Sequence, residues 1–424
     1  MARFIFTPFG SGGDVNPHIW LGKLLAARGH EVTLITVPLF RQAAEKAGLN
    51  FVPVGREEDF LSILQNPELW RPFTGTRLVF QEALKSLPWF FDAISRELAR
   101  GPAVVVSPFH QFAARAAREK FGAPLLTVHL QPACFLSAWD TPVFFTWAGT
   151  MPWVPRWLKA FVVNHGNPAN GMVRPALKKF CAGVGIKMPD RPLPQWLHSP
   201  DGNLALFPGW FGAPQPDWPP KTRAVGFPQE DLRGQYAWLP DIEKFISAGE
   251  KPLLFSHGTG NAHSREFFQT ALEACERMGR RALLGTRFPA QLPQPLPLLA
   301  RAFDYLPFSE LLPRVAALVH HGGIGTMSQA FAAGIPQLVM PMAHDQPDNA
   351  ARLKRLGCGT WMTPRKFTAA NLARELERLL GDDAIKSNCL RIARLCREDH
   401  AAKLAVEMME GFASGSDFKR PGQS

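Results

Sequence analysis

The sequence lacks long apolar runs and recognisable cysteine motifs. No uninterrupted apolar stretch reaches about 18 residues, the length needed to span a membrane as a helix, and the N-terminus lacks the apolar segment of a secretory signal. The six cysteines include no CxxC pair and no Cys/His spacing typical of zinc sites. We therefore expect a reduced, cytoplasmic protein that binds no metal.

Tyrosine is scarce, and acidic residues are fewer than basic ones. Only two tyrosines accompany 32 phenylalanines and 12 tryptophans, and 47 Lys and Arg against 36 Asp and Glu give a formal net charge of +11. This charge favours anionic partners such as nucleotide phosphates or anionic lipids. Because the basic residues are scattered and no nucleic-acid-binding module is recognisable, we do not expect nucleic-acid binding.

The chain length and the order of its patterns indicate two α/β domains. A single core rarely grows beyond roughly 250 to 300 residues, and this chain has 424. The apolar run RFIFTPF enters GSGGDVNPH, then a helical pattern and the apolar run EVTLITVP, which is the unit of a parallel sheet. This alternation restarts at KPLLFSHGTGN, after a proline-rich stretch. We predict an N-terminal domain, a linker, a C-terminal domain, a helix and a disordered tail, over residues 1–216, 217–229, 230–385, 386–412 and 413–424.

Two glycine loops follow apolar runs in the second half. VAALVHHGGIGTMSQAFAAG is typical of a buried strand, a glycine turn and a helix whose free N–H groups could bind a diphosphate. LLFSHGTGN offers a second loop with Ser256, Gly258 and Thr259. Either loop could be only a tight turn, but two adjacent histidines at the end of a strand favour a ligand. Neither loop has the spacing of a Walker or a dinucleotide-binding motif.

Asp14 lies in the first glycine loop, at the carboxyl end of a strand. Asn16 followed by Pro17 matches a helix N-cap with proline at the first helical position, so capping would not explain Asp14. A solvent-exposed loop aspartate is the alternative. Asp14 is therefore a candidate catalytic carboxylate.

Residues 134–222 are dense in Trp, Phe and Pro and follow neither the helical nor the strand period. The segment either forms irregular core or lines a large apolar pocket.

The blocks GSGGDVNP, FSHGTG and HHGGIGT with AAGIPQLVMPMAHDQPDNAARL resemble, in this order, those of the family 1 glycosyltransferases. The resemblance implies two Rossmann-like domains that face each other across a cleft, with the C-terminal helix packed on the N-terminal domain. The N-terminal domain would bind the acceptor and the C-terminal domain the nucleotide sugar. It implies a nucleotide-sugar donor, which is a co-substrate and not a cofactor, and an acceptor with a hydroxyl group.

The resemblance also assigns roles on the donor side. His321 would contact the phosphate nearest the nucleoside, Asp345 and Gln346 would bind sugar hydroxyls, and Tyr305 would lie against the base. Backbone contacts would come from Leu306. The full set of donor-binding candidates is Ser256, Gly258, Thr259, Tyr305, Leu306, His321, Gly323, Gly325, Thr326, Asp345 and Gln346.

Many relatives carry a catalytic histidine in a GHxxP loop, oriented by an aspartate about a hundred residues later. Here DVNP places Asp14 at the position of that histidine, and SPFHQ, residues 107–111, offers no aspartate. Asp14 would thus be the base, and His18, one helical turn later, is the competing candidate. The aromatic segment would bind the acceptor through Phe144, Phe145, Trp147, Trp153 and Trp157.

Within the family, the chain resembles the rhamnosyltransferases of rhamnolipid synthesis. We expect an inverting transfer of L-rhamnose from dTDP-L-rhamnose to a hydroxyacyl lipid. The alternatives are a UDP-glucose-dependent glucosyltransferase acting on a sterol, polyketide or phenolic, and a non-catalytic binder of sugar nucleotide or lipid. The net charge and the aromatic segment also suggest reversible attachment to an anionic membrane.

Overall fold

The first of two parallel sheets forms the core of the N-terminal lobe. The computed structural model describes residues 1–144, 149–165, 167, 169–231, 238–258, 260–261 and 263–415. The strand order is β3-β2-β1-β4-β5-β6-β7. These strands are β1 Arg3–Phe6, β2 Glu31–Thr36, β3 Asn50–Pro53, β4 Val104–Pro108, β5 Leu125–His129, β6 Gly202–Ala205 and β7 Thr222–Ala224.

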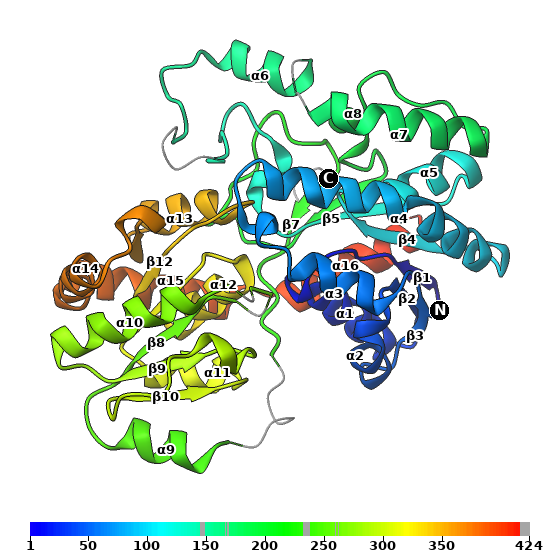
Figure 1. Cartoon of the computed structure of the whole chain (residues 1–424). Coiled ribbons are helices and arrows are strands. Elements are labelled where there is room, and N and C mark those ends of the chain that lie inside the picture. The colour runs from blue at the N-terminus through cyan, green and yellow to red at the C-terminus, as the bar shows by residue number, and fades with distance from the viewer. Residues whose placement is uncertain are drawn as a thin grey trace.

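The second sheet has the order β10-β9-β8-β11-β12-β13 and forms the core of the C-terminal lobe, to the left in Figure 1. Its strands are β8 Leu253–Ser256, β9 Ala282–Gly285, β10 Ala300–Phe303, β11 Ala317–His320, β12 Gln337–Val339 and β13 Gly359–Trp361. The expected fold, two Rossmann-like α/β domains, is thereby confirmed.

Helices cover both sheets. The N-terminal lobe contains α1 Gly12–Ala26, α2 Arg41–Lys46, α3 Glu57–Leu64, α4 Thr74–Ala99, α5 Phe112–Phe121, α6 Arg156–Asn164, α7 Ala169–Val184 and α8 Pro192–Trp196. From the second half of the chain come α9 Pro240–Ser247, α10 Arg265–Met278, α11 Phe308–Leu311, α12 Ile324–Ala333, α13 Gln346–Arg355, α14 Ala369–Gly381, α15 Asp383–Glu398 and α16 Ala401–Ala413.

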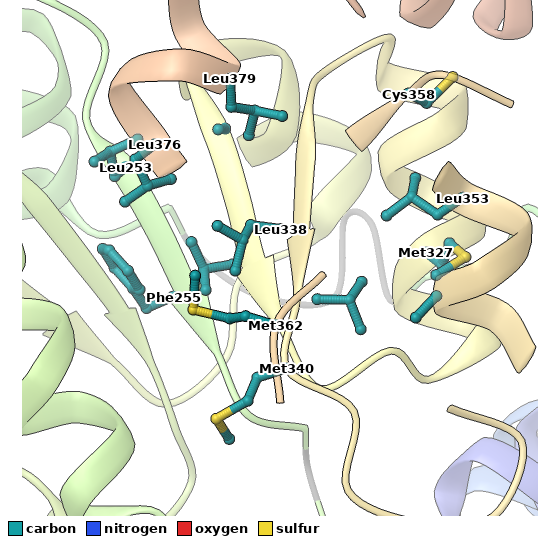
Figure 2. Packing of buried hydrophobic residues seen from close by; sticks show 14 of the residues in the cluster. Leu253, Phe255, Met327, Leu338, Met340, Leu353, Cys358, Met362, Leu376 and Leu379 are labelled. Atoms are coloured by element: carbon teal, nitrogen blue, oxygen red, sulfur yellow. The ribbon is translucent and has the colours of Figure 1, made fainter. Parts of the chain in front are cut away.

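The core of the C-terminal lobe explains why its strands are almost entirely apolar. Strands of a parallel sheet covered on both faces must be apolar on both faces. Figure 2 shows Leu253 and Phe255 of β8, Leu338 of β12 and Leu376 of α14 in one packed group, and all four are fully buried. All six cysteines are buried and free.

Two expected segments differ in detail from the prediction. Residues 217–229, expected as a linker, contribute β7, which pairs with β6 of the first sheet. The helix expected at 386–412 is two helices, because the chain is extended at Asp399, between α15 and α16. The tail residues 416–424 lie outside the described residues.

After this break the chain returns to the N-terminal lobe. Ala405 and Met409 of α16 are fully buried in the same cluster as Phe4 and Leu21, and Figure 1 shows α16 beside α1. At its far end Glu410 accepts two hydrogen bonds from the Arg28 guanidinium, at 2.7 and 3.0 Å. The C-terminal helix therefore packs on the N-terminal lobe, as expected.

A buried arginine joins the two lobes. Arg352 of α13 lies in an ion pair with Asp348 of its own helix (2.7 Å) and in another with Asp140 of the N-terminal lobe (2.7 Å). It also donates to the Phe211 carbonyl oxygen at 3.1 Å. Asp348 in turn accepts the backbone N–H of Val143 at 3.1 Å. These hydrogen bonds and ion pairs lie within α13 or join it to the aromatic-rich segment 134–222 of the N-terminal lobe.

We predict that Arg352→Met lowers the free energy of unfolding by about 3–5 kcal/mol, because methionine fills similar space but leaves the buried Asp348 without its cation and Asp140 with only the exposed Arg355. The matched control is Arg355→Met, since Arg355 pairs with the same Asp140 but its side chain is 57% exposed. The control should cost no more than about 1 kcal/mol. Equal losses in urea unfolding would show that the buried network does not hold the lobes.

Candidate active site

The candidate site lies where the strand order of each sheet reverses. The reversal falls between β1 and β4 in the first sheet and between β8 and β11 in the second. Loops leaving such a pair diverge and open a crevice at the carboxyl edge, where α/β proteins bind ligands. Asp14 and His110 follow β1 and β4, and Gly258 and His321 follow β8 and β11.

The two edges face each other. His344, in the loop after β12, has a left-handed backbone with φ of 60°, and its Nε2 donates to the Leu69 carbonyl oxygen of the N-terminal lobe at 2.8 Å. The charge of Asp14 is one of the causes that raise the pKa of Asp345. The candidate base and a candidate sugar-binding residue therefore lie close enough, on facing sides of the two lobes, for their charges to interact.

Helix α1 begins earlier than predicted, and this changes the account of Asp14. Ser11 is the N-cap, and Asp14, three residues later, accepts the Ser11 backbone N–H at 2.8 Å and its hydroxyl at 3.0 Å, both on Oδ2. The prediction of an N-cap at Asn16 was wrong, because a polar residue three positions after Ser11 can cap the helix from within. Pro17 lies inside the helix.

Capping leaves part of Asp14 available. No hydrogen bond to its Oδ1 occurs within the described chain, and the side chain is only half-buried. A Cβ atom on Gly10, where φ is +130°, would lie 2.4 Å from Asp14 Oδ2. Glycine at position 10 thus makes room for the carboxylate.

His18 is buried behind Asp14. Its Nδ1 lies 2.8 Å from the Asp14 carbonyl oxygen, so Nδ1 carries the proton and donates. Burial, opposed by this hydrogen bond, lowers the pKa of His18 to about 4, so the ring is neutral at pH 7. Because the side chain is fully enclosed, His18 holds the first turn of α1 and lies away from the cleft surface.

His110 was not among the predicted site residues. Its Nε2 lies 3.0 Å from the Phe9 carbonyl oxygen, directly before the Asp14 loop. Burial lowers the pKa of His110, while the charge of Asp14 acts in the opposite direction. The sequence did contain a signal, because VVVSPFH is a strand that ends in a histidine at the edge where Asp14 lies.

On the opposite side of the cleft, two glycines enclose His321. A Cβ atom would lie 2.7 Å from its ring at Gly258, where φ is +87°, and 2.5 Å from its Nε2 at Gly323. Burial lowers the pKa of His321 to about 4. Its Nδ1 is buried and has no hydrogen-bond partner among the described residues. A neutral imidazole with one uncommitted nitrogen therefore lies at the start of α12.

The neighbouring histidines serve different purposes. His320 accepts the Gly322 N–H at Nδ1 (3.2 Å) and donates from Nε2 to Gln337 (3.0 Å), so it is a structural core residue. His257 Nδ1 accepts from the Asn261 side-chain amide at 3.1 Å and lies 2.6 Å from the Ser264 hydroxyl, which leaves the proton on Nε2. That Nε2 is buried without a partner in the described chain. An unpaired buried donor beside His321 is a further candidate for an anion contact, and the prediction missed it.

The first turn of α12 completes the anion site. Gly323 is its N-cap, and Gly325 and Thr326 lie in the first turn, where backbone N–H groups have no partner within the helix. Ser256 ends the adjacent β8, while Thr259 lies outside the described residues. Helix dipole and free N–H groups make such a terminus suited to phosphate.

The comparisons with known proteins agree with this geometry. The Glycosyltransferase family 28 N-terminal domain model matches residues 4–120, and the Erythromycin biosynthesis protein CIII-like, C-terminal domain model matches residues 290–407. The chain is a GT-B glycosyltransferase. It is 28% identical, over 97% of both chains, to O-mycaminosyltylonolide 6-deoxyallosyltransferase of Streptomyces fradiae.

Solved structures resemble the glycosyltransferase over nearly its whole length. The calicheamicin glycosyltransferase CalG4 is 22% identical, with a TM-score of 0.72 over 98% of both chains. The glycosyltransferase VinC, solved in complex with dTDP, is 20% identical, with a TM-score of 0.69 over 97% of this chain and 99% of that chain. These likenesses support the GT-B fold.

The loop after β12 carries the candidate sugar-binding residues of the glycosyltransferase. The Gln346 side-chain oxygen accepts the backbone N–H of Met342 at 2.8 Å, so its amide NH₂ remains as a donor. Asp345 accepts from Asn349 Nδ2 at 2.6 Å. Burial raises the pKa of Asp345 to about 7, and the nearby Asp14 charge adds to this. A carboxyl that titrates near neutral pH can either donate or accept.

The remaining predicted residues are the two candidates for the nucleotide base and the candidates for acceptor binding. Tyr305 is half-buried with the Arg287 guanidinium 5.7 Å from its ring centre, and Leu306 is buried in the core. On the acceptor side Trp153 and Trp157 are 75% and 71% exposed, and Phe144 is 42% exposed. Phe145 and Trp147 lie outside the described residues. The three aromatic residues that lie within the described part of the chain are therefore exposed and do not line an enclosed pocket.

No group of three or more His, Cys, Asp and Glu side chains is arranged to hold a metal ion in the described part of the glycosyltransferase. Nor is any helix there long and apolar enough to cross a membrane.

Asp345 predicts a pH-dependent stability. The folded state holds this proton up to about pH 7, whereas the ordinary value is 3.8, so the folded state binds more protons between these values. The free energy of unfolding should therefore fall as pH rises through this window. Asp345→Asn, which can still accept from Asn349, should flatten the slope, as urea unfolding at intervals from about pH 4.5 to 7.5 would measure. Asp92→Asn on the exposed face of α4 is the control, and equal slopes in all three proteins would contradict the shift.

Proposed function

We propose that the glycosyltransferase transfers a deoxyhexose from a dTDP-sugar to the hydroxyl group of a hydrophobic acceptor, with inversion at the anomeric carbon. The observation that carries the proposal is the position of Asp14 opposite Asp345, His321 and the N-terminus of α12. In this proposal Asp14 is the proton acceptor on one side of the cleft, and the residues opposite it bind the diphosphate and the sugar.

The negative charge that develops on the leaving diphosphate would be stabilised by side chains and backbone N–H groups of the C-terminal lobe. His321 would donate its N–H to a phosphate oxygen, and Gly325 and Thr326 would donate backbone N–H groups from the first turn of α12. Gln346 would donate its amide, and Asp345 would hydrogen-bond a sugar hydroxyl. Tyr305 and Leu306 are proposed at the base, with Ser256, Gly258 and Thr259 as the second loop.

Asp14 would accept the acceptor's proton late in the reaction. A hydroxyl is far less acidic than a carboxylic acid, so the proton moves only as the oxygen attacks the anomeric carbon from the face opposite the diphosphate. His18, hydrogen-bonded to the Asp14 backbone, is proposed as a positioning residue.

The names of two similar proteins bear on the sugar and the acceptor. A dTDP donor is supported by VinC, which binds dTDP, and a deoxyhexose by the relative named for 6-deoxyallose. Our first choice is L-rhamnose and a hydroxyacyl lipid. A polyketide aglycone is the second, because that relative is named for tylonolide. Mass spectrometry of a panel of nucleotide sugars against both acceptors distinguishes them, and transfer only from UDP-glucose would reject the donor.

For the donor site, His321→Ala should weaken dTDP binding about 5- to 150-fold, the equivalent of about 1–3 kcal/mol for a hydrogen bond to a charged group. Calorimetry measures this directly. His165→Ala, at the exposed end of α6, is the control and should bind dTDP normally. Unchanged affinity in His321→Ala would remove this residue from the site.

For catalysis, Asp14→Asn should lower turnover by about 10²- to 10⁴-fold, the usual contribution of a general base. Asparagine can still accept from the Ser11 N–H, so α1 and dTDP affinity should be retained. Asp59→Asn, on the exposed surface of α3, should keep full turnover. If Asp14→Asn retains more than about a tenth of the rate, Asp14 is not the base.

A further inference from the structure

Exposed aromatic side chains gather around α6. Of the sixteen large hydrophobic side chains that are exposed in the described chain, six lie within residues 139–162. The six are Trp139, Phe144, Trp153, Trp157, Phe161 and Val162. We call five of them, without Phe144 but together with Arg156 and Lys159, the aromatic-basic surface, because Arg156 links Trp139 to α6 and the other four lie in α6 or just before it. Isolated exposed apolar residues are normal, but a cluster marks a binding surface.

Helix α6 contributes no residue to the core. None of its side chains is buried, and Trp157 and Phe161, one turn apart, are 71% and 55% exposed. Figure 1 shows α6 at the outer edge of the molecule, above α7 and α8. An amphipathic helix of a globular domain directs its apolar side chains inward. Here they face solvent, so the folded chain alone does not explain them.

Basic residues lie in and near α6 as well. The Arg156 guanidinium lies 3.6 Å from the centre of the Trp139 ring, and Lys159 Nζ donates to the Thr150 carbonyl oxygen at 2.9 Å. Residues 141–189 contain no Asp or Glu and six basic residues, Arg156, Lys159, Arg174, Lys178, Lys179 and Lys187. The segment therefore carries +6 of the net charge of +11.

We propose that the aromatic-basic surface docks the enzyme reversibly on an anionic lipid bilayer. Trp157, Phe161 and Trp153 would enter the headgroup region, where aromatic rings partition well, and the basic residues would contact lipid phosphates. A second copy of the chain is a poor occupant, because each copy carries +6 in the segment 141–189 that contains this surface, and two such segments would repel each other. The docking goes beyond the proposed transfer reaction and does not depend on it.

Vesicle sedimentation tests the proposal without any activity measurement. The full chain should bind phosphatidylcholine vesicles that contain phosphatidylglycerol at low salt, and should bind pure phosphatidylcholine vesicles weakly. The double variant Trp157→Ala/Phe161→Ala should lose at least about fivefold in partitioning. Trp89→Ala/Phe121→Ala removes a matched exposed pair, 54% and 48% exposed, from elsewhere on the N-terminal lobe and should bind like the parent.

A charge variant separates the two contributions. Lys178→Glu/Lys179→Glu should bind less and should depend less steeply on salt, because exposed charges act through screened attraction. Thermal unfolding confirms that each variant is folded. Absence of vesicle binding, or an equal loss in the Trp89→Ala/Phe121→Ala control, overturns the proposal. So does a parent that is dimeric in solution and becomes monomeric in the Trp157→Ala/Phe161→Ala variant, since the surface would then be a protein interface.

Discussion

The buried guanidinium of Arg352 determines how the two walls of the cleft are placed. It lies on α13, the helix that begins directly after Asp345, and it pairs with Asp140 of the opposite lobe. An ion pair with only 2% of the arginine side chain exposed cannot exchange its partners for water without a large cost. The loop that carries Asp345 is therefore fixed against the N-terminal lobe by electrostatics and not by apolar contact alone.

The histidines of the cleft are kept neutral by burial. His18, His257 and His321 all have a lowered pKa, with burial as the largest cause. A neutral imidazole donates a hydrogen bond from one ring nitrogen and accepts one at the other, so the direction of each hydrogen bond is fixed. This matters beside a diphosphate, because a fixed donor stabilises developing charge without having to reorient. The helix terminus supplies the remaining positive potential.

Patterns of period and spacing predicted most of the fold. The buried apolar runs and glycine loops identified β1, β8 and β11 and placed Asp14 and His321 at carboxyl edges, because parallel strands end at a common edge. The start of α1 was mispredicted, since Ser11 and Asn16 are both good caps and only the folded loop decides between them. Arg352 was missed because its partner Asp140 is more than 200 residues away, and local patterns contain no information about such pairs. The break at Asp399 was missed because no glycine or proline marks it in the sequence.

The chain crosses between the lobes twice, and both crossings pass the same point. The backbone of Gly226 has φ of +110°, and an added Cβ atom would lie 3.0 Å from Ala401 and 3.4 Å from Asp399, where the second crossing occurs. Two crossings that lie side by side restrict rotation of one lobe against the other more than a single linker would. Together with the ion pair between Arg352 and Asp140, they keep Asp14 and Asp345 in one relative position.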